Sequence, residues 1–183
     1  MRKLFRTLAI LLSAVLAVAS LAIVTYDLMY YEPNRSEISH VIGTATPEER
    51  HLPMPLASFL RWEFRNGTEA YAASLLIRHL GIVQPRANAL HWAAIYDPWI
   101  ALVKFHLNVE ERMTVIAVLA PMGTDRYGLS AASLAQFHKP LSELGAAECA
   151  TLVALIQAPT LRRNPEALAY VSGSILRRYG NGT

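Results

Sequence analysis

Residues 123–165 read GTDRYGLSAASLAQFHKPLSELGAAECATLVALIQAPTLRRNP, and this stretch decides the fold. A glycine-containing turn precedes a helix rich in small residues, and a second helix rich in alanine and leucine follows. Glu148 stands in the first turn of that second helix, where a carboxylate interacts favourably with the exposed N–H groups. Pro159 ends the helix, and Asn164 with Pro165 starts the next one. The stretch therefore predicts short helices that small residues allow to pack closely.

Helical patterns also predominate in the rest of the chain. Apolar residues recur at helical spacing, and no segment alternates with a period of two. The further segments with a helical pattern are 56–64, 68–80, 88–107 and 109–119. Thr68 and Asn108 are predicted N-caps, and Pro98 predicts a break near Asp97. The prediction is an all-α domain of about six or seven helices.

The N-terminal segment predicts a membrane anchor. Residues Thr7 to Tyr26 carry no charge, and twenty residues at about 1.5 Å each span about 30 Å, the thickness of a bilayer core. Arg2, Lys3 and Arg6 precede this run, which predicts a cytoplasmic N-terminus and an extracytoplasmic domain. The alternative is a signal peptide cleaved after Ala17-Val18-Ala19. A retained anchor is favoured because the apolar run continues past that site.

The chain is therefore expected to have four parts, defined by charge, hydropathy and turn residues. Residues between Asp27 and Glu49 show weak periodicity and include Pro33 and Gly43, which predicts a stalk and loop. The predicted parts are a cytoplasmic flank (1–6), a transmembrane anchor (7–26), the stalk and loop (27–49) and a helical domain (50–183).

Charge and cysteine content exclude several classes of protein. Three of the 17 basic residues precede the anchor, which leaves 14 basic residues to balance the 14 acidic ones. This neutral balance gives no support to a nucleic-acid partner. The single cysteine, Cys149, permits no intramolecular disulfide and is expected to be a small buried residue. The histidines show no metal-ligand spacing, so neither a metal nor another cofactor is predicted.

The 123–165 stretch resembles the C-terminal half of the glycosyltransferase family 51 domain, the peptidoglycan glycosyltransferases that polymerise lipid II. Seven residues agree with the family pattern over about forty positions without a gap: Gly128, Ala131, Ala132, Phe137, Lys139, Leu144 and Glu148. Asp125 stands where the family has its second glycine. The resemblance implies a lysozyme-like helical domain. With the anchor, it implies a single-pass protein of the bacterial inner (cytoplasmic) membrane.

The family uses two glutamates, one as a general base and one near the donor pyrophosphate. A hydroxyl nucleophile needs a positioned base, and a departing pyrophosphate needs nearby cations. Glu48 and Glu49 match the Glu-Asp pair of the first family motif and are the catalytic candidates. Leu52, Pro55 and Ala57 depart from the aromatic, histidine and glycine of that motif. A solvated acidic loop remains the alternative.

The other polar motifs of the family are changed. Ser74 and Leu75 stand at a glutamine pair, whereas Arg78 matches the arginine that follows. In the next motif, Thr114 stands at a glutamate and Val118 at an asparagine. Apolar positions of the same motifs largely match, so the pattern preserves packing residues better than polar ones.

The second glutamate has no counterpart in this sequence. An ungapped register places Tyr96 at its position, a gapped register places Leu90 there, and Asp97 is the nearest acid. Lys139 and Arg126 are the remaining candidates for contacting an anionic substrate group, with solvated surface positions as the alternative.

These observations favour a membrane-anchored, non-catalytic relative of the peptidoglycan glycosyltransferases, a pseudoenzyme that binds or scaffolds other components of envelope assembly. The alternative is an active peptidoglycan glycosyltransferase, a hexosyltransferase, for which the resemblance also implies a divalent cation. A glycan-cleaving enzyme would need an acid such as Glu48 or Glu63. The expected partners are the membrane, lipid II or glycan, and envelope-assembly proteins, without nucleic acid.

Overall fold

The computed structural model describes residues 2–65, 67–83, 89–123 and 127–180. Within these ranges the chain forms helices and turns, with a single isolated bridge between Pro121 and Tyr127. The all-α prediction is therefore confirmed for the described part of the chain. The chain divides into two compact units, Met1–Glu37 and Ile38–Thr183.

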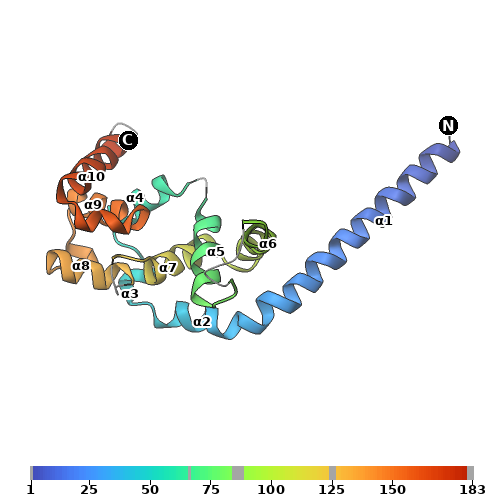
Figure 1. The fold of residues 1–183 in the computed structure, drawn as a ribbon, viewed down its shortest axis with the longest axis horizontal. Helices are drawn as coiled ribbons and strands as arrows, with labels where there is room; N and C mark the ends of the chain where they lie inside the picture. The colour runs from blue at the N-terminus through green and yellow to red at the C-terminus, as the bar shows by residue number, and fades with distance from the viewer. Residues whose placement is uncertain (1, 66, 84–88, 124–126, 181–183) are drawn as a thin grey trace. The chain divides into compact units, whose positions relative to one another are not determined.

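The first unit consists mainly of the helix α1 (Arg2–Tyr26), followed by the π-helical turn η1 (Asp27–Tyr31) and the short η2 (Glu32–Asn34) (Figure 1). By length and composition, this N-terminal helix is able to cross a membrane. Its apolar side chains are exposed, Ile10 and Val18 at 68% each. Such a surface is stable only where something apolar covers it. The cytoplasmic placement of the N-terminus stays a prediction.

The prediction of a stalk and loop for residues 27–49 is wrong in its secondary structure, because the chain is mainly helical there. After η1 and η2 the chain forms α2 (Arg35–Thr44) and α3 (Pro47–Arg50). Pro33 lies in the first turn of η2 and Gly43 lies near the end of α2, so neither residue interrupts a helix. Pro47 stands at the first position of α3, where its missing N–H costs nothing, and Thr46 Oγ1 accepts from Glu49 N at 3.2 Å as an N-cap.

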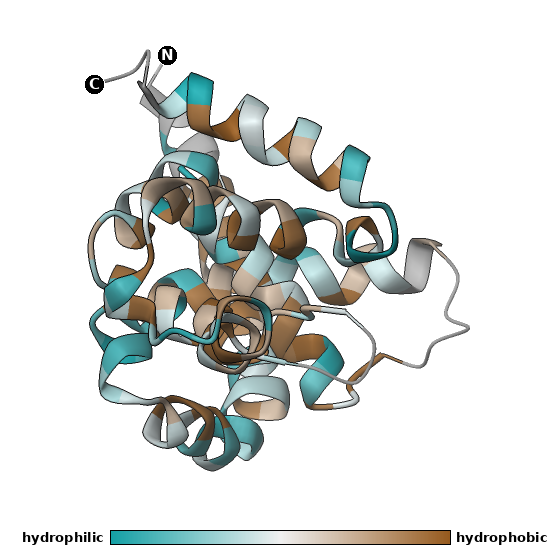
Figure 2. Ribbon diagram, turned by 90° about the vertical axis from the view of Figure 1, so that its left-hand side faces the viewer, coloured by the Kyte–Doolittle hydropathy of each residue, from teal (hydrophilic) through white to brown (hydrophobic). Residues whose placement is uncertain are grey.

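The second unit packs its helices around two centres (Figure 1). Its elements after α3 are α4 (Leu56–Glu63), α5 (Thr68–His79), α6 (Ala89–His106), α7 (Val109–Leu119), α8 (Leu129–Phe137), η3 (Leu141–Glu143), α9 (Ala146–Gln157), η4 (Pro159–Arg163) and α10 (Pro165–Gly180). Helix α5 packs against α6 and α7, and α9 packs against α4 and α10. In Figure 2, brown apolar segments and teal polar segments alternate along single helices.

Two local predictions change in the structure. Gly67 is the N-cap of α5, and Thr68 is its first helical residue, whose Oγ1 donates to Phe64 O at 2.9 Å. Helix α6 runs through Pro98 without the predicted break. The residue after the proline, Trp99, is fully buried. We attribute the continuity to this burial, because packing of a large side chain offsets the lost backbone hydrogen bond.

Candidate functional site

Glu48, the candidate general base, is bound to the backbone of a distant turn. It lies on α3, and its carboxylate accepts from Leu141 N at 2.8 Å and Ser142 N at 3.3 Å, and from the Ser142 hydroxyl. The Ser142 hydroxyl bond is the main reason that the pKa of Glu48 is lowered. An ionised carboxylate with these partners holds α3 against η3. A general base must instead reach a substrate hydroxyl.

Glu49 is buried, with 6% of its surface exposed, and both of its oxygens have structural partners. Oε2 accepts from Thr46 N at 3.0 Å and from the Thr46 hydroxyl at 3.1 Å. Oε1 accepts from Ser130 N at 3.2 Å, at the start of α8. Glu49 therefore completes the capping box of α3 and also caps α8.

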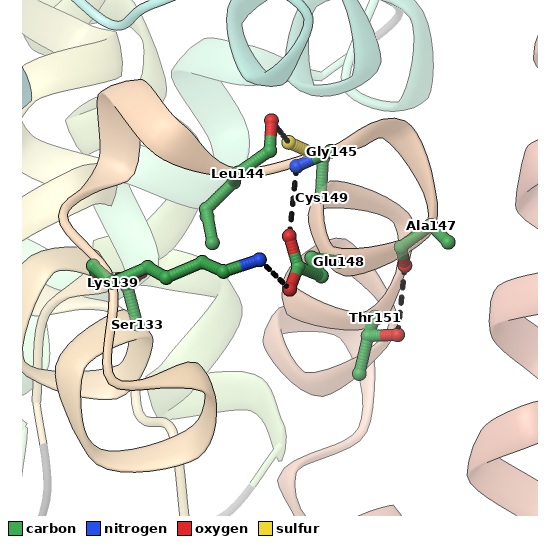
Figure 3. A network of polar contacts seen from close by, with 8 residues as sticks. All are labelled: Ser133, Lys139, Leu144, Gly145, Ala147, Glu148, Cys149 and Thr151. Atoms are coloured by element: carbon green, nitrogen blue, oxygen red, sulfur yellow. Dashed lines mark hydrogen bonds and ion pairs between the residues drawn. The ribbon is translucent and has the colours of Figure 1, made fainter.

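Lys139 forms an ion pair with Glu148, the acid in the first turn of α9 (Figure 3). The Lys139 Nζ lies 2.7 Å from Glu148 Oε1, and Glu148 Oε2 accepts from Gly145 N at 2.8 Å. The Lys139 bond is the first cause of the lowered pKa of Glu148, and the Gly145 bond is the second. The predicted helix-start role of Glu148 is confirmed, and the candidate substrate contact Lys139 already has an acidic partner.

The structure brings the candidate residues only partly together. Glu48 binds the backbone at Leu141 and Ser142, and Lys139 precedes the same turn, but each side chain has a different partner. Arg126, the other candidate for an anionic group, lies outside the described residues.

Glu63, the other acid considered, lies at the end of α4 between α9 and α10. Its Oε1 accepts from the side chain of Gln157 and lies 3.9 Å from Arg178 Nη1. Its Oε2 is buried without a hydrogen-bond partner in the described part of the chain. Arg178 also lies over the Trp62 ring, 5.5 Å from its centre. This arrangement joins three helices around the carboxylate.

The positions that carry family carboxylates are occupied here by structural groups. The Tyr96 hydroxyl, at the ungapped position of the second glutamate, donates to Ala70 O at 3.0 Å and so joins α6 to α5. Burial raises the pKa of Tyr96. Thr114, at the other family glutamate, is buried and donates to Glu110 O at 3.0 Å within α7.

A pocket of about 560 Å³ lies between α5 and α7, within the size range of small-molecule sites. We call it the α5–α7 pocket. Its lining residues are Leu75, Arg78, His79, Val118, Leu119, Pro121 and Tyr127. It brings together Leu75 and Val118, which stand where the family has amide side chains, with the matching Arg78. The pocket that corresponds to the cleft of the family therefore has mainly apolar walls and one guanidinium group, that of Arg78.

No acid is among the described residues that line the α5–α7 pocket. A divalent cation prefers carboxylate and carbonyl oxygens. The described lining residues therefore do not fit the cation that the family resemblance implies for an active enzyme.

Comparisons with known proteins agree with the best-matched part of the sequence. A family model described as Transglycosylase matches residues 108–179, from the N-cap of α7 into α10. Residues 108–179 match the transglycosylase family. The resemblance predicted from residues 123–165 is confirmed by this match. The match also covers Val118, so one wall of the α5–α7 pocket lies in the transglycosylase segment.

Two curated relatives extend the similarity toward the N-terminus. Penicillin-binding protein 1A of Clostridium perfringens (strain 13 / Type A) is 29% identical over 136 residues, which is 73% of this chain and 18% of the relative. The same protein of the ATCC 13124 strain is 29% identical over 136 residues, 73% of this chain and 15% of the relative. The chain thus spans less than a fifth of either relative.

Sequence reasoning missed the partners that decide what the candidate acids do. Ser142 is 94 residues from Glu48, and Gln157 is 94 residues from Glu63. Neither partner belongs to a local motif that would have signalled the contact. The Glu148 contact with Gly145 followed from local spacing, because both residues lie in one helix start. The Thr46–Glu49 capping box has the same three-residue spacing and could have been found in the same way.

Proposed function

We propose that this chain is a membrane-anchored, non-catalytic relative of the peptidoglycan glycosyltransferases that binds lipid II or glycan during envelope assembly. The observation that carries the proposal is the composition of the α5–α7 pocket. Leu75 and Val118 form walls where the family has amides, and no described lining residue is an acid. Proton transfer from an acceptor hydroxyl would find no carboxylate base among these residues.

The bonding of the candidate acids supports the same proposal. Glu48 holds the turn at Leu141 and Ser142, and Glu49 caps two helices. Moving either carboxylate to a substrate would leave backbone N–H groups without partners, at a cost of about 1–3 kcal/mol each where they are buried. These acids are therefore better suited to hold the fold than to move protons.

The pocket retains features for binding an amphiphilic ligand. Its apolar walls suit a hydrocarbon segment, and the exposed Arg78 offers a guanidinium for a phosphate. Lipid II combines these two chemical features. The role proposed for the chain is therefore to hold a lipid-linked precursor and present it to other envelope-assembly proteins.

Lipid II binding and polymerisation by the purified full chain test the proposal. We expect saturable binding without glycan polymer. Arg78→Gln should weaken binding about tenfold, the effect of losing one charge-assisted contact. The matched control is Arg163→Gln, which removes an exposed arginine outside the pocket. The alternative, an active peptidoglycan glycosyltransferase, predicts polymer that Glu48→Gln abolishes. A membrane pull-down that recovers no envelope protein would count against the scaffolding role.

A further inference from the structure

A second pocket, of about 190 Å³, lies beside the start of α7. It is lined by the polar side chains of Arg50, His51, Arg61 and Glu110, by Leu52, and by the buried Ala57 and Met113. We call it the basic pocket. None of its lining residues lines the α5–α7 pocket. An inference about it therefore does not rest on the proposed function.

The charged groups of the basic pocket are largely available to a ligand. Arg50 donates one N–H to Gly43 O, which leaves its other guanidinium N–H groups. Within the part of the chain that the structure describes, the side chains of Arg61, His51 and Glu110 make no hydrogen bond or ion pair. Two guanidinium groups facing one carboxylate give the pocket a net positive charge.

We propose that the basic pocket binds a phosphate monoester. Guanidinium groups match phosphate oxygens with paired N–H donors, and a phosphate monoester carries a charge of about −1.5 to −2 at neutral pH. With Glu110 counted, the pocket carries about one net positive charge, which offsets part of the charge of the monoester, and its two guanidinium groups offer several N–H donors to the phosphate oxygens. The nearby buried Ala57 and Met113 limit competition from water on one side.

The size of the basic pocket limits the part of the ligand that it holds. A volume of about 190 Å³ is below the roughly 300–1,000 Å³ of sites that enclose a whole small molecule. The pocket therefore suits the phosphate group itself, with the remainder of the ligand outside. Two sources share this chemistry: a free phosphate, or the headgroup of a lipid such as phosphatidic acid in a bilayer.

Two probes distinguish these sources with the full chain. The first is inorganic phosphate, titrated by calorimetry into detergent-solubilised protein at constant ionic strength against chloride. The second is calorimetric titration of the same detergent-solubilised protein with short-chain phosphatidic acid or short-chain phosphatidylglycerol, because the anchor helix would insert into vesicles of any composition. Saturable phosphate binding supports the free ligand. A preference for phosphatidic acid over phosphatidylglycerol supports the headgroup, because phosphatidylglycerol carries only a diester.

Variants with opposite expected effects separate binding from damage to the fold. Arg61→Gln should weaken binding of the phosphate probe about tenfold, because it removes a charge-assisted contact. Glu110→Gln should tighten binding several-fold, because a negative charge leaves the pocket. A misfolded variant would not bind more tightly. Arg163→Gln removes the same charge as Arg61→Gln outside the pocket and should change nothing.

Three results would overturn the phosphate site. One is no saturable binding of inorganic phosphate together with no preference for phosphatidic acid over phosphatidylglycerol. Another is an equal loss of binding in Arg163→Gln, which would indicate nonspecific charge attraction. The third is weaker binding in Glu110→Gln. Because lipid II is not used in these experiments, their outcome is independent of whether the α5–α7 pocket binds that lipid.

Discussion

The α9 core and the α5–α7 pocket differ in how closely they follow the family pattern. In α9 the acid at the helix start, Glu148, keeps its place, and Leu152 and Val153 are fully buried. In the pocket, Leu75 and Val118 replace family amides. Packing residues of α9 are required by any version of this fold, whereas amides in the pocket are required only by the chemistry of the cleft. This difference is the basis of our proposal that the chain keeps the fold without the reaction.

The largest effect is expected in α9. Leu152→Ala removes a fully buried side chain, and we expect a loss of about 2–5 kcal/mol in the free energy of unfolding because a cavity forms. Chemical denaturation measures this loss. Leu134→Ala is the matched control, because Leu134 is 55% exposed and its truncation should change stability by less than about 0.5 kcal/mol. Equal losses would contradict the placement of the core at α9.

The glycine before α8 should give the next largest effect. Gly128 has φ of +86°, and a Cβ there would lie 3.1 Å from Val118 O. Gly128→Ala should therefore cost about 1–3 kcal/mol through strain. The control is Gly43→Ala in α2, where a Cβ meets nothing within 4 Å. That change should stabilise the chain by about 0.5–1 kcal/mol, and a loss there would contradict the helical assignment of α2.

The role of Glu48 predicts a specific dependence on pH. Its pKa is lowered in the folded chain, mainly by the Ser142 hydroxyl. The carboxylate therefore stabilises the fold above its ordinary pKa of 4.5, and this contribution is lost as pH falls through the lowered folded value. Urea unfolding of wild type and Glu48→Gln should show a difference in the free energy of unfolding at pH 7 that narrows below pH 4.5. A difference that does not change with pH would contradict this structural role.

The smallest effect is expected in the pocket. Val118 is half-buried and lines the pocket, and valine and asparagine have similar helix propensities. Val118→Asn, which introduces the family residue, should therefore change stability by less than about 1 kcal/mol, because its amide can reach water. Thermal unfolding measures the change. A loss as large as that of Leu152→Ala would remove the distinction between core and pocket.

Local features of this fold followed from the sequence, and distant contacts did not. Asn108 was predicted as a cap, and its side chain accepts from Glu111 N at 2.9 Å, because capping depends on residues three positions apart. The path of α6 through Pro98 depends on the burial of Trp99, a tertiary contact. For the same reason the helices within residues 27–49 were missed, since packing of Ile38 and Val41 stabilises α2.

The candidate site was predictable only as a list of residue types. The family pattern marks positions such as Leu75 and Val118 as changed, and the structure brings both to one pocket. It did not indicate that Glu48 binds a turn 94 residues away. Such pairings depend on how helices pack, which no spacing in the sequence encodes.

Incubation of the purified full chain with lipid II, followed by separation of the products by length, tests the loss of chemistry most directly. We predict that lipid II remains unpolymerised and that wild type and Glu48→Gln are indistinguishable. Glycan strands formed by wild type and absent with Glu48→Gln would contradict a non-catalytic role, because they would show that the carboxylate on α3 still acts as a base.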